Sequence, residues 1–179
     1  MTLGSLTTVP ASEHLDLLAD PVRAGAERDG LLGELEVVEI DAADSDTAVT
    51  KQRYGLDDGD LANCVVVAGS RAGEERIAAC VVLADSRADV NGAVRRLLDV
   101  RKASFLPMER AVAESGMEFG GITPIGLPSG WRLLIDARVL ERPAVVIGSG
   151  VRRSKIVLPG AVLARLAGAE VIAGLGLVS

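Results

Sequence analysis

Two long apolar segments in the middle of the chain constrain its fold more than any other feature. Residues 61–68 (LANCVVVA) and 77–84 (IAACVVLA) are almost continuously apolar, whereas residues 69–76 between them are polar and contain glycine. This arrangement predicts two paired strands joined as a hairpin. Because successive side chains of a strand face opposite sides, apolar residues at nearly every position indicate strands that are covered on both faces. We therefore expect this hairpin at the centre of a packed sheet.

Shorter segments with strand or helix signals surround the hairpin. A run rich in β-branched residues predicts a strand over residues 34–40, and further short strands are expected over residues 102–105, 133–136, 145–148 and 155–158. Capping residues and glycine or proline stops predict helices over residues 12–19, 21–30, 47–54, 89–98, 107–115 and from Pro159 to about Ala167. Strands outnumber helices and do not alternate with them as regular βαβ units. The expected fold class is therefore α+β, with a mixed, mostly antiparallel sheet that is curved or closed into a barrel and flanked by helices.

Length and the absence of repeats favour one domain. The chain has 179 residues without an internal repeat or a low-complexity linker. We expect a single domain over residues 1–179, with a helical N-terminal segment over about residues 1–33. Residues 1–10 lack the basic stretch and apolar run of a secretory signal, and no apolar run approaches the roughly 18 residues of a membrane span. We therefore expect a cytoplasmic protein without membrane contact.

The composition excludes several kinds of chemistry. The chain has one His, two Cys, one Trp, one Tyr and two Phe, and its formal net charge is -6. These numbers leave too few His and Cys residues for a zinc site or a His-based catalytic triad. Broad binding to DNA or RNA would need a basic surface, and single strands would need aromatic stacking platforms. We expect neither metal nor cofactor. Cys64 and Cys80 are expected as small buried side chains, with a disulfide between neighbouring strands as the alternative.

A loop dense in glycine and proline is the strongest candidate for a site. Its central residues are Gly120, Gly121, Ile122, Thr123 and Pro124. Adjacent glycines let a ligand or another backbone come close, and the proline fixes the chain just beyond them. Such a loop can direct backbone N–H groups at a carbonyl oxygen or a developing oxyanion. A tight structural turn is the alternative, and a phosphate-binding P-loop is excluded because no Gly-Lys-Ser/Thr follows.

A few other positions are candidates for ligand contact. Asn63 interrupts the first apolar strand, where its amide either bonds the backbone or lines a pocket. Lys102 could neutralise a phosphate, and Asp136 could either cap a turn or orient a pocket group. Ser149 precedes Gly150 in a Gly-Ser-Gly turn that either lines a pocket or simply reverses the chain. Since no base is close in the sequence, Ser149 is a poor candidate for a nucleophile.

Taken in chain order, these motifs resemble the YbaK/prolyl-tRNA-synthetase-associated editing domain family. The resemblance spans about residues 34–168, and its most specific part is the GGITPIG loop, because Gly120 to Pro124 matches the family's glycine-x-x-x-proline loop. It implies a mixed sheet or barrel with surrounding helices, and hydrolysis of the ester of mischarged aminoacyl-tRNA. In the family the glycine loop cradles the aminoacyl carbonyl, while a 2′-hydroxyl of the tRNA end or a water does the acid–base or nucleophilic work.

The resemblance makes a free-standing aminoacyl-tRNA deacylase the first hypothesis. Its partners would be the acceptor end of a mischarged tRNA and an aminoacyl-tRNA synthetase. The catalytic residues would be Gly120, Gly121 and Asn63. The substrate-binding residues would be Ile122, Thr123, Pro124, Lys102, Asp136, Ser149 and Gly150. A local basic rim, formed by Arg101, Lys102, Arg152 and Arg153, could hold the acceptor end alone despite the acidic balance of the chain.

One departure from the family pattern supports a second hypothesis. The family has a lysine near the ester and the terminal adenosine, and Asn63 stands in its place here. An amide can form hydrogen bonds but supplies no charge, and one charge-assisted contact typically contributes about 1.5–3 kcal/mol. The lysine's role is therefore unnecessary, transferred to another base such as Lys102, or lost with the activity. The alternative function is a non-catalytic module that binds an aminoacyl group, a tRNA end or another small ligand.

Overall fold

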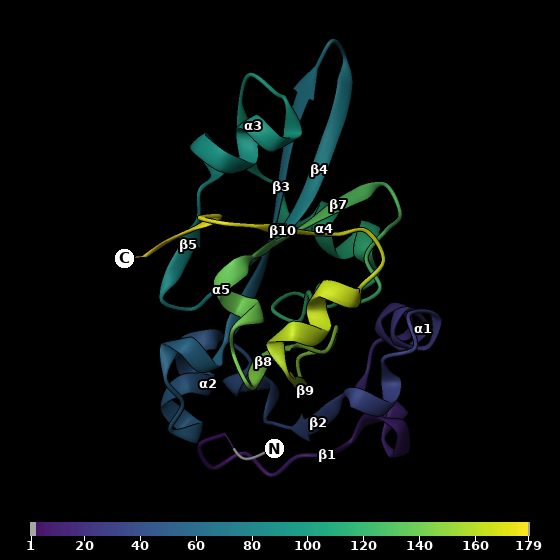
Figure 1. Ribbon diagram of the computed structural model, residues 1–179. Helices are drawn as coiled ribbons and strands as arrows, with labels where there is room; N and C mark the ends of the chain where they lie inside the picture. Colours follow the sequence, from purple (N-terminus) through teal and green to yellow (C-terminus); the bar gives the residue numbers. More distant parts are fainter. Residues whose placement is uncertain (1–2, 179) are drawn as a thin grey trace.

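The computed structural model describes residues 3–178, which combine helices with β-sheets (Figure 1). The ends of the expected domain, residues 1, 2 and 179, lie outside the described residues. The larger sheet has five strands in the order β10-β7-β4-β3-β6. Its strands are β3 (Ala62–Arg71), β4 (Glu74–Leu83), β6 (Ala103–Phe105), β7 (Trp131–Asp136) and β10 (Ala169–Ile172).

Two further sheets complete the strand architecture. One has the order β1-β2-β9-β8, with β1 (Val9–Pro10), β2 (Glu36–Glu39), β8 (Val145–Gly148) and β9 (Ser154–Leu158). The other pairs β5 (Ser86–Ala88) with β11 (Gly176–Val178). Within the named strands, β7 runs parallel to β4 and β10, and every other pair is antiparallel. The predicted mixed, mostly antiparallel α+β fold is therefore confirmed.

Short helices connect and flank the sheets. The α-helices are α1 (Asp20–Arg28), α2 (Thr47–Tyr54), α3 (Arg95–Leu98), α4 (Met108–Ser115) and α5 (Ala137–Leu140). Tighter 3-10 turns are η1 (Ala11–Glu13), η2 (Leu15–Leu17), η3 (Leu32–Glu34), η4 (Ala42–Asp44), η5 (Asp58–Asp60) and η7 (Gly160–Arg165). A π-helical turn, η6 (Val90–Val94), leads into α3.

Most predicted elements are present, and the differences have local causes. The predicted helix over residues 12–19 is wrong, because η1 and η2 occupy this segment as separate turns on either side of His14. Leu17 and Leu18 are both buried, although Leu18 itself is extended with ψ of 141°. The helix expected after Pro159 is a 3-10 helix. The strands β1, β5, β10 and β11, of two to four residues each, were not predicted.

The central position of β4 explains why its sequence is apolar from Ile77 to Leu83. Ala79, Val81 and Leu83 belong to the cluster that fills the space toward the four-stranded sheet and α1. The alternate residues, Ala78, Cys80 and Val82, pack on the opposite face with side chains of η6 and α3. The predicted coverage on both faces is therefore confirmed for β4. In β3, by contrast, Asn63, Cys64 and Val65 are only partly buried, because they line the cleft described below.

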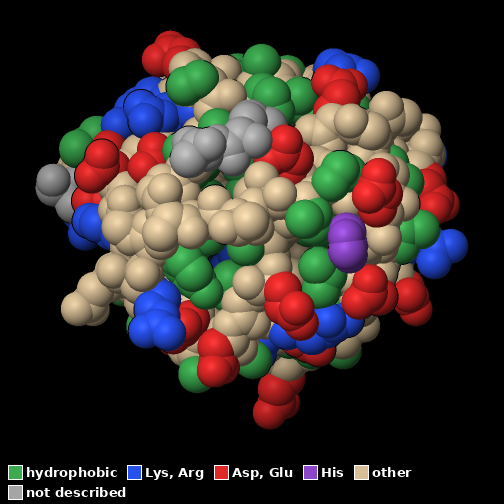
Figure 2. Space-filling view, turned by 90° about the horizontal axis from the view of Figure 1, so that it is seen from below, with side chains coloured by type: hydrophobic (Ala, Val, Ile, Leu, Met, Phe, Trp, Pro, Cys, Tyr) green, Lys and Arg blue, Asp and Glu red, His purple; other side chains and the backbone are tan. Residues whose placement is uncertain are grey.

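Acidic side chains neutralise most of the basic ones at the surface. Arg110 bonds Glu75 at 2.8 Å, and Arg132 bonds Glu170 at 2.6 Å. On the face shown in Figure 2, acidic and basic side chains are interspersed and form no broad basic area. No helix among residues 3–178 has both the length and the apolar character that crossing a bilayer would require.

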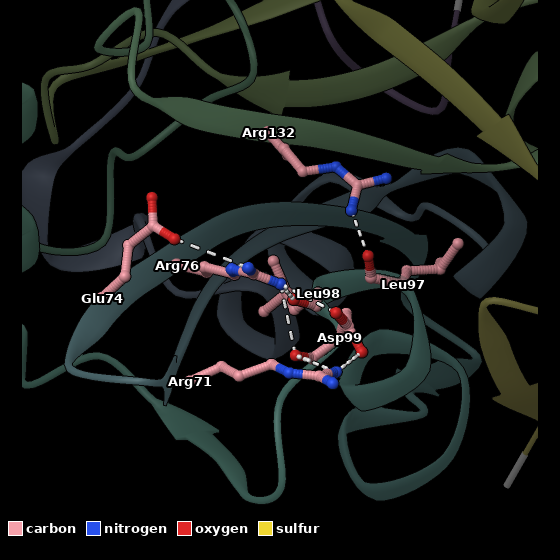
Figure 3. A network of polar contacts seen from close by, with 7 residues as sticks. All are labelled: Arg71, Glu74, Arg76, Leu97, Leu98, Asp99 and Arg132. Carbon is pink, nitrogen blue, oxygen red and sulfur yellow. Dashed lines mark hydrogen bonds and ion pairs between the residues drawn. The ribbon is translucent and has the colours of Figure 1, made fainter.

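The far end of the β3–β4 hairpin is anchored by arginine side chains (Figure 3). Arg71 on β3 and Arg76 on β4 both bond Asp99, which ends α3 in the left-handed conformation with φ of 54°. Arg76 also donates to the carbonyl oxygen of Leu98 at 2.9 Å, and Arg132 on β7 reaches the carbonyl of Leu97. These bonds satisfy helix-end carbonyls, which otherwise lack partners. They hold the long hairpin against α3.

A glycine contact between α1 and the loop before β7 gives a test of this packing. A Cβ on Gly25 would lie 2.6 Å from the backbone of Gly126, although alanine favours helices by about 1 kcal/mol. We expect Gly25→Ala to lower the free energy of unfolding by about 1–3 kcal/mol, because backbone cannot rearrange as a side chain does. Urea denaturation measures the effect. Gly33→Ala is the control, since nothing lies within 4 Å of its added Cβ. Equal stabilities of the two variants would contradict the prediction.

Candidate active site

A cleft of about 220 Å³ opens where the start of β3 meets the four-stranded sheet. Leu61, just before β3, forms an isolated bridge to Val146 of β8, and this bridge joins the two sheets. Apolar side chains of β3, β8 and the glycine loop form most of the lining. The polar residues that line the cleft are Ser45, Asp46, Thr47, Asn63 and Lys155.

One edge of β3 is open along this cleft. β3 pairs with β6 only from Val67 to Gly69, so between the Leu61–Val146 bridge and Val67 no strand of the described chain pairs with this edge. The carbonyl oxygen of Val66 accepts a bond from the Leu106 amide at 2.8 Å on that side. Alternate residues of an antiparallel strand present their backbone groups to the same edge, so the amide and carbonyl of Cys64 point there as well. The cleft therefore offers an unpaired backbone donor and acceptor.

The glycine loop forms the opposite wall because the turn after β8 holds it there. The Glu118 amide donates to the Gly150 carbonyl at 2.8 Å, and the Gly150 amide donates to the Gly121 carbonyl at 2.8 Å. The Arg152 amide donates to the Glu118 carboxylate at 2.6 Å. Gly148 allows the close approach, since a Cβ there would lie 2.5 Å from the Gly121 oxygen. The two glycine-rich segments thus form one clamped unit.

Within this loop, Gly120 and Gly121 have different environments. Gly120 lines the cleft with φ of 76°, a conformation that side chains with a Cβ rarely adopt. Gly121 is buried behind it, and its amide donates to the Glu118 carbonyl at 2.9 Å. Ile122 lines the cleft again. Within residues 3–178, the amides of Gly120 and Ile122 donate to no protein acceptor. The amides of Gly120 and Ile122, rather than that of Gly121, are therefore unused donors in residues that line the cleft.

Asn63 lies in the cleft at the position where the sequence predicted a site. Its side-chain oxygen accepts a bond from the Thr47 hydroxyl at 2.5 Å. Thr47 begins α2, which follows the 3-10 turn η4 along the rim of the cleft. This bond leaves the Asn63 NH₂ group as a donor toward a ligand.

Lys155 is a cleft residue that the sequence analysis did not single out. It lies on β9, is only 7% exposed, and its Nζ donates to the Ser45 carbonyl at 2.7 Å. Burial lowers the pKa of Lys155 to about 8, with the nearby charge of Asp46 opposing this shift and that of Arg152 adding to it. The available signal was the place of Lys155 in a predicted strand, residues 155–158, whose other residues are all apolar. A strand with apolar residues on both faces is covered on both sides, so its lysine is expected in the interior.

The remaining predicted residues lie outside the cleft. Thr123 and Pro124 are buried behind the loop. Ser149 is buried, with its hydroxyl bonded to Ser154 and to backbone carbonyls. Asp136 caps α5 by accepting from the Arg138 amide and also accepts from the Gly176 amide. Of the predicted residues, the structure therefore brings Asn63, Gly120 and Ile122 together in the cleft. Gly121 and Gly150 lie behind them, and the hydrogen bond between the two holds the glycine loop in place.

The predicted basic rim does not form as a group. Lys102 is exposed beside β6, six residues along β3 from Asn63, which is about 20 Å at ~3.3 Å per residue. Arg152 donates to the carbonyls of Phe119 and Ala42 at 3.1 Å each, and its guanidinium lies over the Phe119 ring. Arg153 bonds Asp16. Of this predicted rim, Arg152 alone lies beside the glycine loop, and its hydrogen bonds hold the rim of the cleft together.

The cysteines are free. Cys64 partly lines the cleft and Cys80 is buried in β4, and burial raises the pKa of both thiols, that of Cys80 to about 12. A thiol with a raised pKa is a weak nucleophile because little thiolate is present at neutral pH. Among residues 3–178, no group of three or more His, Cys, Asp or Glu side chains could hold a metal ion.

The buried ammonium of Lys155 predicts a specific pH dependence of stability. Its pKa is about 8 in the fold and ordinarily 10.5, so the unfolded chain binds more protons between these values and stability rises with pH there. We expect the free energy of unfolding of the wild type to gain up to about 3 kcal/mol relative to Lys155→Met between pH 7 and pH 10. Urea titrations at both pH values measure this. Lys102→Met, at an exposed lysine, should show no such change, and a pH-independent difference at Lys155 would refute the prediction.

Residues 42–166 match the aminoacyl-tRNA editing domain family, and no curated protein matches significantly. A proposed trans-editing enzyme for prolyl-tRNA synthetase has a similar structure, with a TM-score of 0.73, 24% identity, and coverage of 87% of this chain and 94% of that one. For the hypothetical protein APE2540 the TM-score is 0.75 and the identity 21%, with coverage of 88% of this chain and 100% of that one.

A third structure shares the fold as part of a longer chain. It is a proposed signal transduction protein from Marinobacter aquaeolei VT8, with a TM-score of 0.60 and 17% identity, and coverage of 88% of this chain and 30% of that one. At these identities the structural likenesses show the fold alone. The match over residues 42–166 covers well over half of the sequence and includes all the residues that line the cleft. This chain therefore belongs to the aminoacyl-tRNA editing domain family.

Proposed function

We propose that this protein hydrolyses the ester of mischarged aminoacyl-tRNA. The observation that carries the proposal is the meeting of Asn63 and the Gly120 loop in one cleft, since the family resemblance assigns both positions to the aminoacyl ester. The open edge of β3 supplies what an aminoacyl group needs for orientation. A substrate α-amino group can donate to the Cys64 carbonyl, while the free amides of Gly120 and Ile122 lie on the opposite wall.

Ester hydrolysis suits a site with few reactive side chains. An aminoacyl ester is already activated, so a water that is positioned by the cleft or by the tRNA 2′-hydroxyl can attack its carbonyl carbon. Preorganised N–H donors stabilise the oxyanion that forms, and such electrostatic stabilisation is usually the largest contribution to catalysis. The amides of Gly120 and Ile122 are candidates for these donors because no other acceptor within residues 3–178 uses them. This mechanism needs neither a histidine nor a metal ligand set.

The lining indicates which part of the substrate enters. Val146, Ile147 and Ile122 make the inner walls apolar, and a volume of about 220 Å³ suits a small apolar aminoacyl group. Because most surface arginines bond carboxylates, we propose contact with the acceptor end alone rather than with a long stretch of tRNA. The reaction would take place in the cytoplasm, where charged tRNA and the synthetases act.

A panel of mischarged tRNAs tests the activity. Purified protein is incubated with tRNAs that carry small non-cognate amino acids, and release of the amino acid is compared with release in buffer. We expect hydrolysis of at least one member well above the buffer rate. If none is hydrolysed, but a non-hydrolysable 3′-aminoacylamido-adenosine binds in titration calorimetry, the deacylase proposal fails. The non-catalytic binding module, which Asn63 in place of the family lysine favours, is then the correct alternative.

The glycine wall gives a second prediction. Gly120→Val places a β-branched residue at φ of 76°, which costs roughly 1–3 kcal/mol and displaces the loop. Because a shift of about 1 Å in a positioned group can lower a rate by about 100-fold, we expect a loss of that order in kcat. Circular dichroism checks that the variant folds. Gly130→Val is the control, since it lies outside the cleft with open space around its Cβ. Full activity of Gly120→Val would refute the role of the loop.

A further inference from the structure

The cleft contains a buried positive charge that no carboxylate balances at close range. All three lysines of the chain lie within residues 3–178, and of these Lys155 alone lines the cleft. Its side chain is buried. Asp46 lines the same cleft and its charge acts on Lys155, but no Asp or Glu of the described residues lies within ion-pair distance of the ammonium. Buried lysines are usually paired, because an isolated charge in a protein interior is costly. An unpaired ammonium in a cleft therefore indicates a ligand that carries negative charge.

The bonding of Lys155 leaves it available to such a ligand. An ammonium has three N–H donors, and one of them donates to the Ser45 carbonyl at 2.7 Å. This bond fixes the direction of the side chain, since Ser45 precedes α2 on the rim of the same cleft. The hydroxyl of Ser45 is itself buried without a hydrogen-bond partner within the described chain. Lys155 and Ser45 thus present unused polar groups to the cleft.

Asn63 and Lys155 line one cleft from different strands. Asn63 lies on β3, and its amide supplies no charge, whereas Lys155 on β9 supplies one. We propose that Lys155 is a catalytic residue that provides, from β9, the positive charge absent at position 63. In the complex its ammonium would contact the carbonyl oxygen of the ester and stabilise the negative charge of the tetrahedral intermediate. This inference rests on the proposed deacylase function.

The step balances with water as the co-reactant. A water oxygen bonds to the carbonyl carbon, the electron pair of the C=O double bond moves to the oxygen, and Lys155 stabilises the resulting oxyanion by charge and hydrogen bonding. The oxyanion then re-forms the double bond and the ester C–O bond breaks. The proton lost by the water goes to the departing ribose oxygen, which gives free amino acid and a tRNA with an intact 3′-hydroxyl.

Exchange of the two positions tests the proposal. Lys155→Met removes the charge, Lys155→Gln removes it but retains an N–H donor, and Asn63→Lys in the Lys155→Met background returns a lysine on β3. We expect both single variants to lose about 100-fold in kcat with little change in KM, because the contact strengthens when the carbonyl oxygen becomes an oxyanion in the transition state. The double variant should recover at least tenfold. Lys102→Gln, about 20 Å along β3, should retain the wild-type rate.

The outcomes separate this inference from the proposed function. A wild type that hydrolyses no mischarged tRNA refutes the deacylase proposal and this inference with it. A wild type that hydrolyses them while Lys155→Met does so equally well overturns only the role of Lys155. A folded Lys155→Met that is inactive, and that Asn63→Lys does not restore, also overturns it, because the lysine then acts through the structure of β9. Recovery in the double variant supports it, since a merely structural role would not be restored from another strand.

Discussion

The backbone hydrogen bonds between two glycine-containing turns hold the cleft in shape. The Glu118 amide bonds the Gly150 carbonyl, and the Gly150 amide bonds the Gly121 carbonyl, so neither turn can move without the other. Gly148 on β8 permits this approach because it lacks a Cβ. The clamp uses the amides of Glu118 and Gly150 and the carbonyls of Gly121 and Gly150, and it leaves the amide of Gly120, which lines the cleft, without an acceptor within residues 3–178. The position of the cleft wall at Gly120 is thus set by hydrogen bonds between residues that do not line the cleft.

Local sequence patterns predicted the parts of this arrangement, but not how they meet. The hairpin of β3 and β4 was predictable because β4 is buried on both faces from Ile77 to Leu83, and this requires apolar residues at each of these positions. The sequence around Gly120 and Gly150 is compatible with either a pocket wall or a structural turn, and it does not distinguish the two. The pairing of these segments joins residues about 30 positions apart, and no periodicity or capping signal encodes such a contact. Gly150 consequently supports the site without lining it.

Lys155 shows the same limit for a charged residue. Lys102 is a candidate from the sequence because it follows Arg101 at a predicted strand, but it lies exposed beside the far end of β3. The environment of Lys155 depends on Ser45, which is 110 residues away in the sequence. A strand pattern shows only that position 155 faces inward. Whether an inward-facing lysine meets a carboxylate, a carbonyl or a cleft is decided by the segment that packs on it.

The scarcity of histidine and aromatic residues then becomes consistent with the proposed chemistry. Backbone amides and one buried ammonium carry no cost of reorganisation during the reaction, and apolar walls such as those of Val146 and Ile147 strengthen their effect by lowering the local dielectric. The same walls destabilise the charged form of Lys155, which lowers its pKa to about 8. Stability and the proposed activity therefore oppose each other at this residue. An unpaired buried lysine lowers the free energy of unfolding, and its place in the cleft accounts for this cost if the lysine binds a ligand, as we propose.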